Sequence, residues 1–167
     1  MKILKQYLII GILSLVFVVT INKYLFFSVN VPSNSMVPTI NKNDRLIIFR
    51  IHDLNSIKKG DILVFYSEEL NQTLIKRVIG LPNDKIDIKA DGDIYINDEL
   101  IIEDYIASPG AISGSYEVPN DSYFFLGDNR ENSLDSRYWI NPYINKDNIM
   151  GRAAYRYYPF NKIANFK

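Results

Sequence analysis

The sequence of 167 residues contains no cysteine. This absence excludes a disulfide scaffold, a thiolate metal site and a cysteine nucleophile, although it does not fix the compartment. Histidine is nearly absent too: His52 is the only one, so no site that needs two imidazoles can be built. Because His52 comes just after the apolar segment 45–50, we interpret it as a polar residue in a loop.

The chain also lacks an excess of charge of either sign, with 19 basic and 19 acidic residues. A neutral chain gives no electrostatic reason to expect nucleic acid as a partner. Nothing in the sequence indicates a metal or another cofactor. What the sequence does contain is 12 tyrosines and 9 phenylalanines, and this abundance of aromatic residues favours a β-rich fold.

Near the N-terminus lies one long apolar segment. Residues 6–21 carry no charge and follow two lysines, Lys2 and Lys5. An uncharged run of this length is typical of a removable signal peptide and also of a short membrane anchor. A removable signal peptide needs small residues at two alternating positions before its cleavage site, but the first alanine of the chain is Ala90.

We therefore expect an uncleaved anchor. Lys23 can extend its ammonium group to the membrane surface, which lengthens the usable span, and three aromatic residues can lie at the interface: Tyr24, Phe26 and Phe27. The predicted span is 7–27. The lysines before it place residues 1–6 in the cytoplasm and residues 28–167 outside the cell, as a single-pass protein of the cell membrane.

The rest of the sequence is a succession of short apolar segments. They predict strands at 44–50, 61–66, 73–80, 85–90, 93–98, 122–129 and 151–159. The pair around the Asp-Gly-Asp turn predicts a hairpin, and no segment after the anchor has helical periodicity. The expected fold is mostly β: an antiparallel β-sheet body with a small inserted β lobe at about 83–121, preceded by one N-terminal transmembrane helix.

A short stretch after the anchor, VPSNSMVPTI at 31–40, is unlike a plain linker. It is stiffened by Pro32 and Pro38, and it places Ser33 and Ser35 on the same side if the chain is extended. A serine nucleophile at this place would act close to the membrane. Such a serine needs a base, and the only imidazole in the chain belongs to a loop.

The other known base for a serine is a neutral lysine in an apolar environment. Lys76 lies in the apolar segment 73–80, and strand alternation turns the neighbouring Arg77 to the other face. The alternative is a lysine on the solvent face of an edge strand.

A third polar segment, 127–139, contains three acids, two arginines and two serines directly after an apolar strand. Asp128 could pair with Arg77, and Asp135 with Arg137. Such pairs would allow the segment to pack against the body and hold a site rigid. Alternatively, it is a solvated loop.

These three segments, in this order after an anchor, resemble those of the bacterial type I signal peptidases. Members of that family are membrane-anchored serine proteases that remove signal peptides from exported proteins. Residues 32–39, PSNSMVPT, are similar to the nucleophile motif of the family, and residues 74–84, LIKRVIGLPND, to its lysine motif. Residues 127–139, GDNRENSLDSRYW, are similar to its third motif, and the resemblance covers nearly the whole chain.

The resemblance implies that Ser35 is the nucleophile and Lys76 the general base, without a cofactor or metal. It implies that Ser33 Oγ joins the Ser35 N–H in the oxyanion hole, and that Ser133 hydrogen-bonds to the lysine amine and orients it. The predicted ion pairs of the third motif become supporting contacts. The resemblance also places five residues in the substrate pocket: Val29, Val31, Pro32, Met36 and Ile75.

The eukaryotic and archaeal branch of the family has histidine where Lys76 stands, so the chain resembles the bacterial branch. Its single span resembles the Gram-positive form. The resemblance implies that the chain removes N-terminal signal peptides from exported preproteins after Ala-x-Ala-type sites. The expected partners are these signal peptides, the lipid bilayer and nearby secretion machinery, with no nucleic acid.

Three other functions fit parts of the sequence. A self-cleaving Ser-Lys repressor would carry a helical DNA-binding domain in place of the anchor. A membrane-anchored β domain that binds exported peptides without cutting them would not need the whole set Ser33, Ser35, Lys76 and Ser133. A membrane protease of wider specificity is poorly separated from the favoured function by sequence alone.

Overall fold

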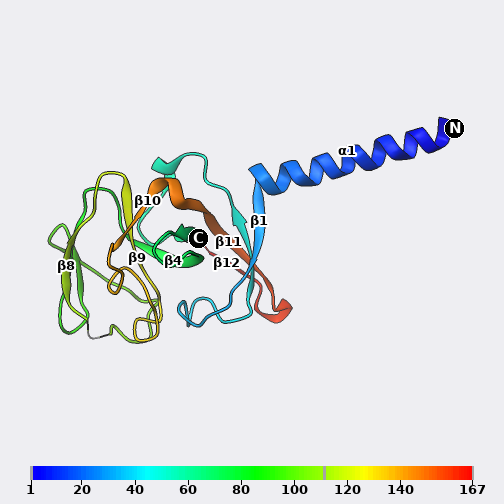
Figure 1. The fold of residues 1–167 in the computed structure, drawn as a ribbon. Coiled ribbons are helices and arrows are strands. Elements are labelled where there is room, and N and C mark those ends of the chain that lie inside the picture. Colours follow the sequence, from blue (N-terminus) through cyan, green and yellow to red (C-terminus); the bar gives the residue numbers. More distant parts are fainter. Residues whose placement is uncertain (1, 111, 167) are drawn as a thin grey trace.

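The computed structural model describes residues 2–110 and 112–166, which form one long helix and a β body (Figure 1). The elements in chain order are α1 (Lys2–Tyr24), β1 (Phe26–Asn30), β2 (Arg45–Phe49), η1 (Leu54–Ser56), β3 (Ile62–Ser67), β4 (Gln72–Gly80), β5 (Lys85–Ile88), β6 (Ile94–Ile96), β7 (Glu99–Ile101), β8 (Gly114–Glu117), β9 (Ser122–Leu126), β10 (Tyr143–Asn145), η2 (Lys146–Asn148), β11 (Ile149–Tyr158), η3 (Phe160–Lys162) and β12 (Ala164–Asn165). The η elements are single 3₁₀ turns.

Helix α1 projects away from the body (Figure 1). Its residues from Ile3 to Thr20 are exposed. The 22 residues Ile3–Tyr24 include an 18-residue window with a mean hydropathy of 2.1. At 1.5 Å per residue they extend about 33 Å, which matches the hydrocarbon core of a bilayer. The side chains of Thr20 and Asn22 each donate a hydrogen bond to a backbone carbonyl one turn earlier, which lowers the cost of placing these polar groups in apolar surroundings.

The helix ends at Tyr24, earlier than the predicted end of the span at position 27. Phe26 and Phe27, which we expected to be interfacial residues of the anchor, are the first residues of β1 and pair with β2. The reason is that strand pairing competes with the helix: the Arg50 N–H at the end of β2 donates to the carbonyl of Leu25 at 2.9 Å.

The loop after β2 also holds the end of α1. Arg50 Nε donates to the carbonyl of Asn22 at 3.1 Å, and His52 Nε2 lies 2.7 Å from the carbonyl oxygen of Tyr24. Carbonyls in the last helical turn have no partner within the helix, and they attract cationic groups and donors. His52 is therefore a loop residue, as predicted, that caps the helix.

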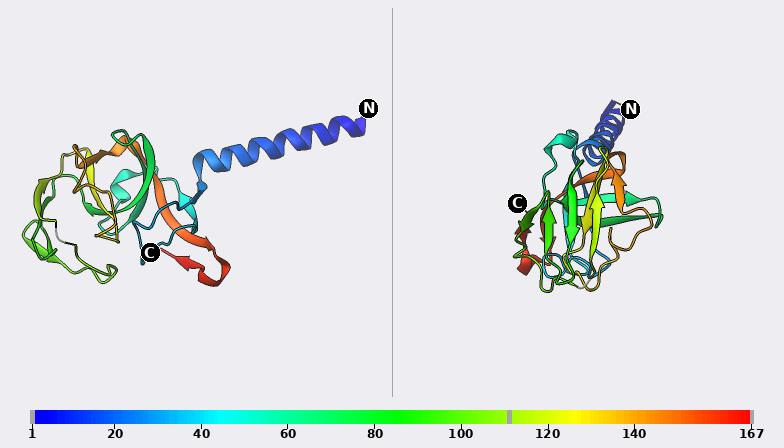
Figure 2. Two further views of the ribbon diagram at one scale, coloured as in Figure 1. Left: turned by 60° about the horizontal axis from the view of Figure 1, so that its bottom comes forward. Right: turned by 90° about the vertical axis from the view of Figure 1, so that its left-hand side faces the viewer.

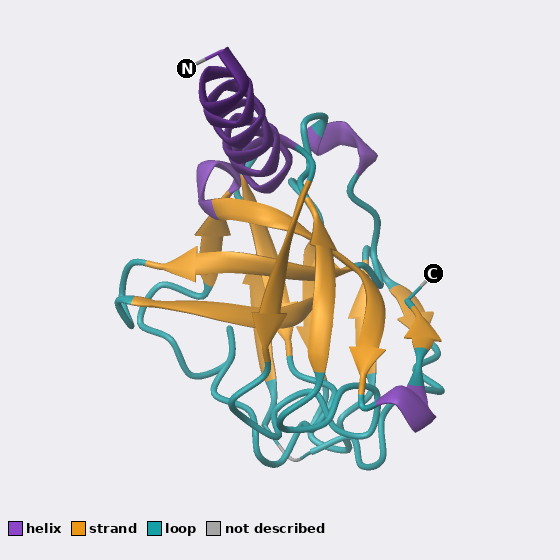
Figure 3. Cartoon of the chain, turned by 90° about the vertical axis from the view of Figure 1, so that its right-hand side faces the viewer, coloured by secondary structure: helices purple, strands orange, loops and turns teal. Residues whose placement is uncertain are grey.

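The main sheet has the strand order β1-β2-β11-β3-β4-β9-β10, with β12 paired to β11, and all pairings are antiparallel (Figure 3). Two apolar clusters pack against it. The first lies beneath the segment that follows β1 and contains Met36, Ile40, Leu46 and Ile48. The second is aromatic, with Phe65 stacked on Phe125 at a ring-centroid distance of 4.2 Å.

A second sheet, of order β7-β6-β5-β8, is inserted between β4 and β9 (Figures 1 and 2). Its β5–β6 pair is the predicted hairpin, with Ile86 opposite Ile96. The second sheet shares one apolar core with the ends of β4 and β9, and this core consists of Ile79, Ile86, Ile88, Ile94, Ile96, Val118, Phe124 and Leu126. The insert is therefore fixed to the body by a common core.

The predicted fold class is confirmed: antiparallel sheets preceded by one apolar helix. Among the described residues no α-helix follows α1. Five strands were absent from the prediction, namely β1, β7, β8, β10 and β12. Each has five residues or fewer. An alternating pattern is hard to recognise over such a length, and pairing with a neighbouring strand determines whether the segment is extended.

Candidate active site

The segment 31–40 leaves β1 and folds into turns over the first apolar cluster. We considered it as an extended chain, but the Val37 N–H donates to the Asn34 carbonyl at 3.2 Å and the Ile40 N–H to the Met36 carbonyl at 2.8 Å. The base of the turn is closed by the Val31 N–H, which donates to the Asp44 carbonyl at 2.9 Å. These backbone hydrogen bonds fix the position of Ser35.

Ser35 meets Lys76 at the centre of the site. Lys76 comes from β4, and its Nζ lies 2.5 Å from Ser35 Oγ. Both residues are nearly inaccessible to solvent, Lys76 being 3% and Ser35 6% exposed. The structure thus joins two segments that are far apart in the sequence through one hydrogen bond.

Burial lowers the pKa of Lys76 from 10.5 to about 8, because a buried ammonium group loses its hydration. Asp135 and Asp128 act in the opposite direction and raise this pKa, while Arg137 lowers it. A substantial fraction of the amine is therefore neutral at mildly alkaline pH, and a neutral amine has the lone pair that accepts a proton.

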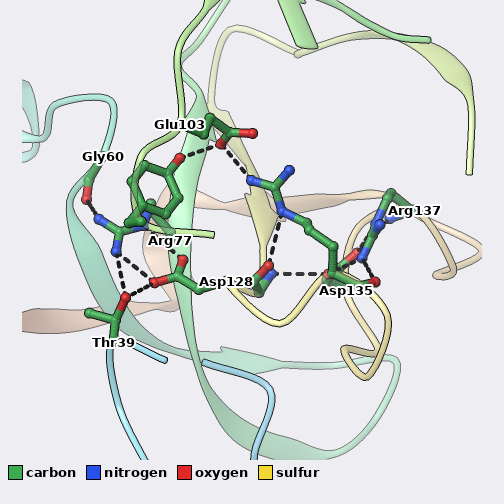
Figure 4. Close-up of polar contacts among 10 residues, drawn as sticks. Thr39, Gly60, Arg77, Glu103, Asp128, Asp135 and Arg137 are labelled. Carbon is green, nitrogen blue, oxygen red and sulfur yellow. Dashed lines mark hydrogen bonds and ion pairs between the residues drawn. The ribbon is translucent and has the colours of Figure 1, made fainter. Parts of the chain in front are cut away.

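Asp128 is held by Arg77, the neighbour of Lys76 on β4 (Figure 4). Arg77 Nε donates to Asp128 Oδ1 at 2.8 Å and Arg77 Nη2 to Oδ2 at 2.6 Å, a bidentate pair. Thr39 Oγ1 donates to the same carboxylate at 2.5 Å, and Arg77 Nη1 to the carbonyl of Gly60 at 2.8 Å. This buried carboxylate links the nucleophile turn to β4.

Asp135 is held in the same manner by Arg137, whose Nε and Nη2 donate to its two carboxylate oxygens at 2.8 and 2.9 Å (Figure 4). Asp135 also accepts a hydrogen bond from the Gly127 N–H at 3.0 Å. The loop 127–137 is tied directly to the nucleophile turn, because the Asn129 N–H donates to the carbonyl of Ser35 at 3.0 Å. The structure therefore brings together both predicted ion pairs.

Gly127 makes this close approach possible. A Cβ atom at position 127 would lie 2.1 Å from Ser133 Oγ and 2.5 Å from the carbonyl oxygen of Ser35. Any side chain there would push the loop away from the nucleophile turn.

Ser33 lies next to the nucleophile, with its Oγ 3.3 Å from Ser35 Oγ. No described residue accepts a hydrogen bond from the Ser35 N–H, so this amide and the Ser33 hydroxyl are two donors at the edge of the site. Ser133 differs from the prediction. Its Oγ is buried without a hydrogen-bond partner among the described residues, and no hydrogen bond to Lys76 is formed. The Ser133 hydroxyl lies close to Gly127.

A cleft of about 440 Å³ opens beside Ser35 and Lys76. Its walls come from β1, from the residues after it and from β4. Four predicted pocket residues line it: Val29, Val31, Pro32 and Ile75. Met36 does not. Its side chain is fully buried in the core, because the turn after Ser35 directs it inward.

The sequence profile of the family described as signal peptidase, peptidase S26, matches residues 4–158. The chain belongs to this family. It is 40% identical over 161 residues to signal peptidase I of Leptolyngbya laminosa, covering 90% of this chain and 78% of that protein. It is 33% identical over 168 residues to signal peptidase I of Bacillus amyloliquefaciens, covering 93% and 89%.

The fold is similar to the crystal structure of a signal peptidase I from Enterococcus faecalis. The TM-score is 0.51 at 30% sequence identity, and the match covers 60% of this chain and 98% of that one. Family membership makes the chain a hydrolase of the signal peptidase I type.

Several residues of this peptidase site were missed by reasoning from the sequence. Thr39 lies inside the nucleophile motif and Asn129 inside the third motif, so the motifs could have indicated both residues. The missed lining residues of the cleft are Phe27, Asn30, Val64, Thr73, Leu74 and Met150. Among the described residues, no group of three or more histidine, aspartate or glutamate side chains could hold a metal ion.

The lowered pKa of Lys76 predicts a pH-dependent stability. Between pH 8 and 10.5 the unfolded chain holds a proton that the folded chain releases, so the free energy of unfolding rises with pH over this range. Below pH 8 the folded state is penalised by about 3 kcal/mol. We expect Lys76→Met, which keeps the length of the side chain without its charge, to be more stable than the wild type at pH 7. The difference should shrink towards pH 10.5.

Denaturant unfolding of the full chain in detergent at several pH values measures this difference. Lys85, an exposed lysine of β5, provides the control variant Lys85→Met. A stability difference for Lys76→Met that is independent of pH would contradict the lowered pKa.

Proposed function

We propose that this membrane-anchored peptidase cleaves signal peptides with Ser35 as the nucleophile and Lys76 as the general base. The observation that carries the proposal is the 2.5 Å contact between the two side chains in a buried site. A serine hydroxyl is a weak nucleophile until a base removes its proton, and here the buried lysine is the group that contacts it. His52 is remote from this role, because it binds the end of α1.

The reaction follows from the position of these atoms. The neutral Lys76 amine accepts the Ser35 hydroxyl proton as Oγ attacks the scissile carbonyl carbon. The resulting oxyanion is stabilised by the Ser35 N–H and the Ser33 hydroxyl. The Lys76 ammonium then gives its proton to the leaving amine, and the mature protein departs while the signal peptide stays bound to Ser35 as an ester. Water, deprotonated by Lys76, hydrolyses this ester and restores the serine.

The cleft offers the substrate two free strand edges. Strand β1 pairs with β2 alone, and the part of β4 before Arg77 pairs with β3 alone. An extended peptide in the cleft can hydrogen-bond to such edges. Its residues one and three before the cut then point to the same side, towards the apolar lining, and we propose that small side chains at these positions are selected there. This arrangement fits Ala-x-Ala-type sites.

We also propose that α1 crosses the cell membrane once, with the N-terminus in the cytoplasm and the catalytic body on the outer surface, near the secretion machinery. Lys2 and Lys5 precede the apolar segment, and positive charge favours the cytoplasmic side. Ser35 follows α1 after a single strand and turn. The nucleophile is thus tethered close to the membrane, where a preprotein held by its own apolar segment presents its cleavage site.

The test of this function is cleavage of a preprotein with Ala-x-Ala before its mature start. The full chain in detergent should release one product whose new N-terminus follows the second alanine. Ser35→Ala and Lys76→Ala should each abolish release, and the double variant should lose no more than either single variant, because the two residues form one proton-transfer unit. Lys85→Ala is the control.

Two results would overturn this proposal. Independent losses that multiply in the double variant would mean that Ser35 and Lys76 do not act together. A wild type that binds the preprotein and leaves it intact would mean that the domain is a binding protein.

The Ser33 hydroxyl predicts a graded effect. Ser33→Ala removes one donor to the oxyanion and should reduce kcat about 100- to 1000-fold with little change in KM. Steady-state kinetics on the same preprotein measure this effect. Ser33→Thr, which retains a hydroxyl, is expected to keep more activity than Ser33→Ala, and equal losses in both variants would exclude the hydroxyl from this role.

A further inference from the structure

Residues 102–110, which follow β7, return from the second sheet to the catalytic body, and Glu103, Tyr105 and Ser108 are among the side chains that contact it. The Arg77 guanidinium lies over the Tyr105 ring, with 3.8 Å between Cζ and the ring centroid. The Tyr105 hydroxyl donates to the Glu103 carboxylate (Figure 4). Neither residue belongs to the three motifs, and neither contacts Ser35 or Lys76 by a hydrogen bond.

Glu103 in turn holds Arg130 in the loop 127–137. Arg130 Nη2 lies 2.5 Å from Glu103 Oε1, and the side chains are 1% and 5% exposed. An arginine buried to this extent is tolerated only with a counter-charge and satisfied donors. Arg130 Nε donates to the Gly127 carbonyl at 3.1 Å, and Arg137 Nη2 donates to the Arg130 carbonyl at 2.7 Å (Figure 4).

These contacts lead to Arg77 and Gly127, the two residues that lie next to the catalytic pair. Tyr105 covers the face of Arg77, which is the neighbour of Lys76 on β4 and the partner of Asp128. Glu103 fixes, through Arg130, the backbone of Gly127, which lies against the Ser35 carbonyl. The segment that follows β7 therefore contacts the neighbours of both Lys76 and Ser35.

We propose that Tyr105, together with Glu103, is a positioning residue that presses the loop 127–137 and Arg77 together and so keeps water away from Lys76. The proposal rests on the proposed role of Lys76 as the base. Tyr105 acts through Arg77 and the loop and does not touch the substrate or the reacting atoms. The inserted sheet thus has a part in catalysis.

If Tyr105 and Glu103 no longer hold the loop 127–137 against Arg77, the pKa of Lys76 rises. Burial is the largest cause of the lowered pKa of Lys76, so water admitted to the site raises it towards 10.5. The charged groups that face Lys76 are Asp128, Asp135 and Arg137, besides Arg77 next to it on β4. If Asp128 and Asp135 lose their arginine partners, they stabilise the Lys76 ammonium more strongly, and this also raises the pKa of Lys76. Tyr105 itself is uncharged, because burial raises the pKa of its hydroxyl.

The experiment is a pH–rate profile of the full chain in detergent, with a soluble peptide that contains an Ala-x-Ala site. For the wild type we expect half-maximal rate near the Lys76 pKa of about 8. For Tyr105→Leu we expect this midpoint to rise by about one pH unit, so that the rate falls roughly tenfold at pH 7 and recovers at pH 10. The control is Tyr95→Leu, because Tyr95 also lies under a cation, Lys89, but within the second sheet.

Loss of fold alone lowers the rate at every pH and leaves the midpoint where it is. If Tyr105→Leu does not fold, Tyr105→Phe keeps the ring on Arg77, loses the hydroxyl and should shift the midpoint less in the same direction. An unchanged midpoint in every variant that folds overturns the positioning role of Tyr105. A wild-type rate that is constant between pH 7 and 9 overturns the Ser35–Lys76 proposal itself, so the two failures are distinguishable.

Discussion

A lysine amine buried against a serine hydroxyl is the contact on which the rest of this structure depends. An ammonium group is costly to bury, and the strand that carries Lys76 has apolar cores on both sides. The fold therefore keeps this side chain where its charged form is disfavoured, and the pKa falls to about 8. The same burial that weakens the folded state at neutral pH supplies the base that we assign to the reaction.

The nearby carboxylates would cancel this effect if they were free. Asp128 and Asp135 both raise the pKa of Lys76, and each is engaged by an arginine in a bidentate pair. The arginines satisfy the carboxylate oxygens and supply compensating charge. The loop can therefore pack against the nucleophile turn without fixing the lysine in its charged form, and both acids serve as structural ties between segments.

Reasoning from the sequence identified the parts of this arrangement that are encoded locally. Alternation predicted the hairpin of β5 and β6. The apolar surroundings of Lys76 left two alternatives, a buried lysine or one on a solvent face, and the structure has the buried one. The opposite directions of Lys76 and Arg77 followed from their being neighbours on one strand. Apolar length predicted the helix, but its end depends on the pairing of β1 with β2.

The parts that depend on tertiary contacts were not predictable in this way. Met36 is buried because the chain turns after Ser35 and packs this side chain into the first apolar cluster. Tyr105 meets Arg77 only because the second sheet folds back on the body, and nothing in its neighbourhood in the sequence indicates this. Ser133 lacks the expected hydrogen bond, and its hydroxyl lies close to Gly127.

The most direct test of the central claim is to titrate the Lys76 amine itself. Nitrogen-15 NMR of the lysine side chains in the full chain, with Lys76→Met to assign the signal, gives the pKa without reference to turnover. The account predicts a midpoint near 8. A midpoint at or above the ordinary value of 10.5 would contradict it, because Lys76 would then be an ammonium group throughout the neutral range and could not accept the serine proton.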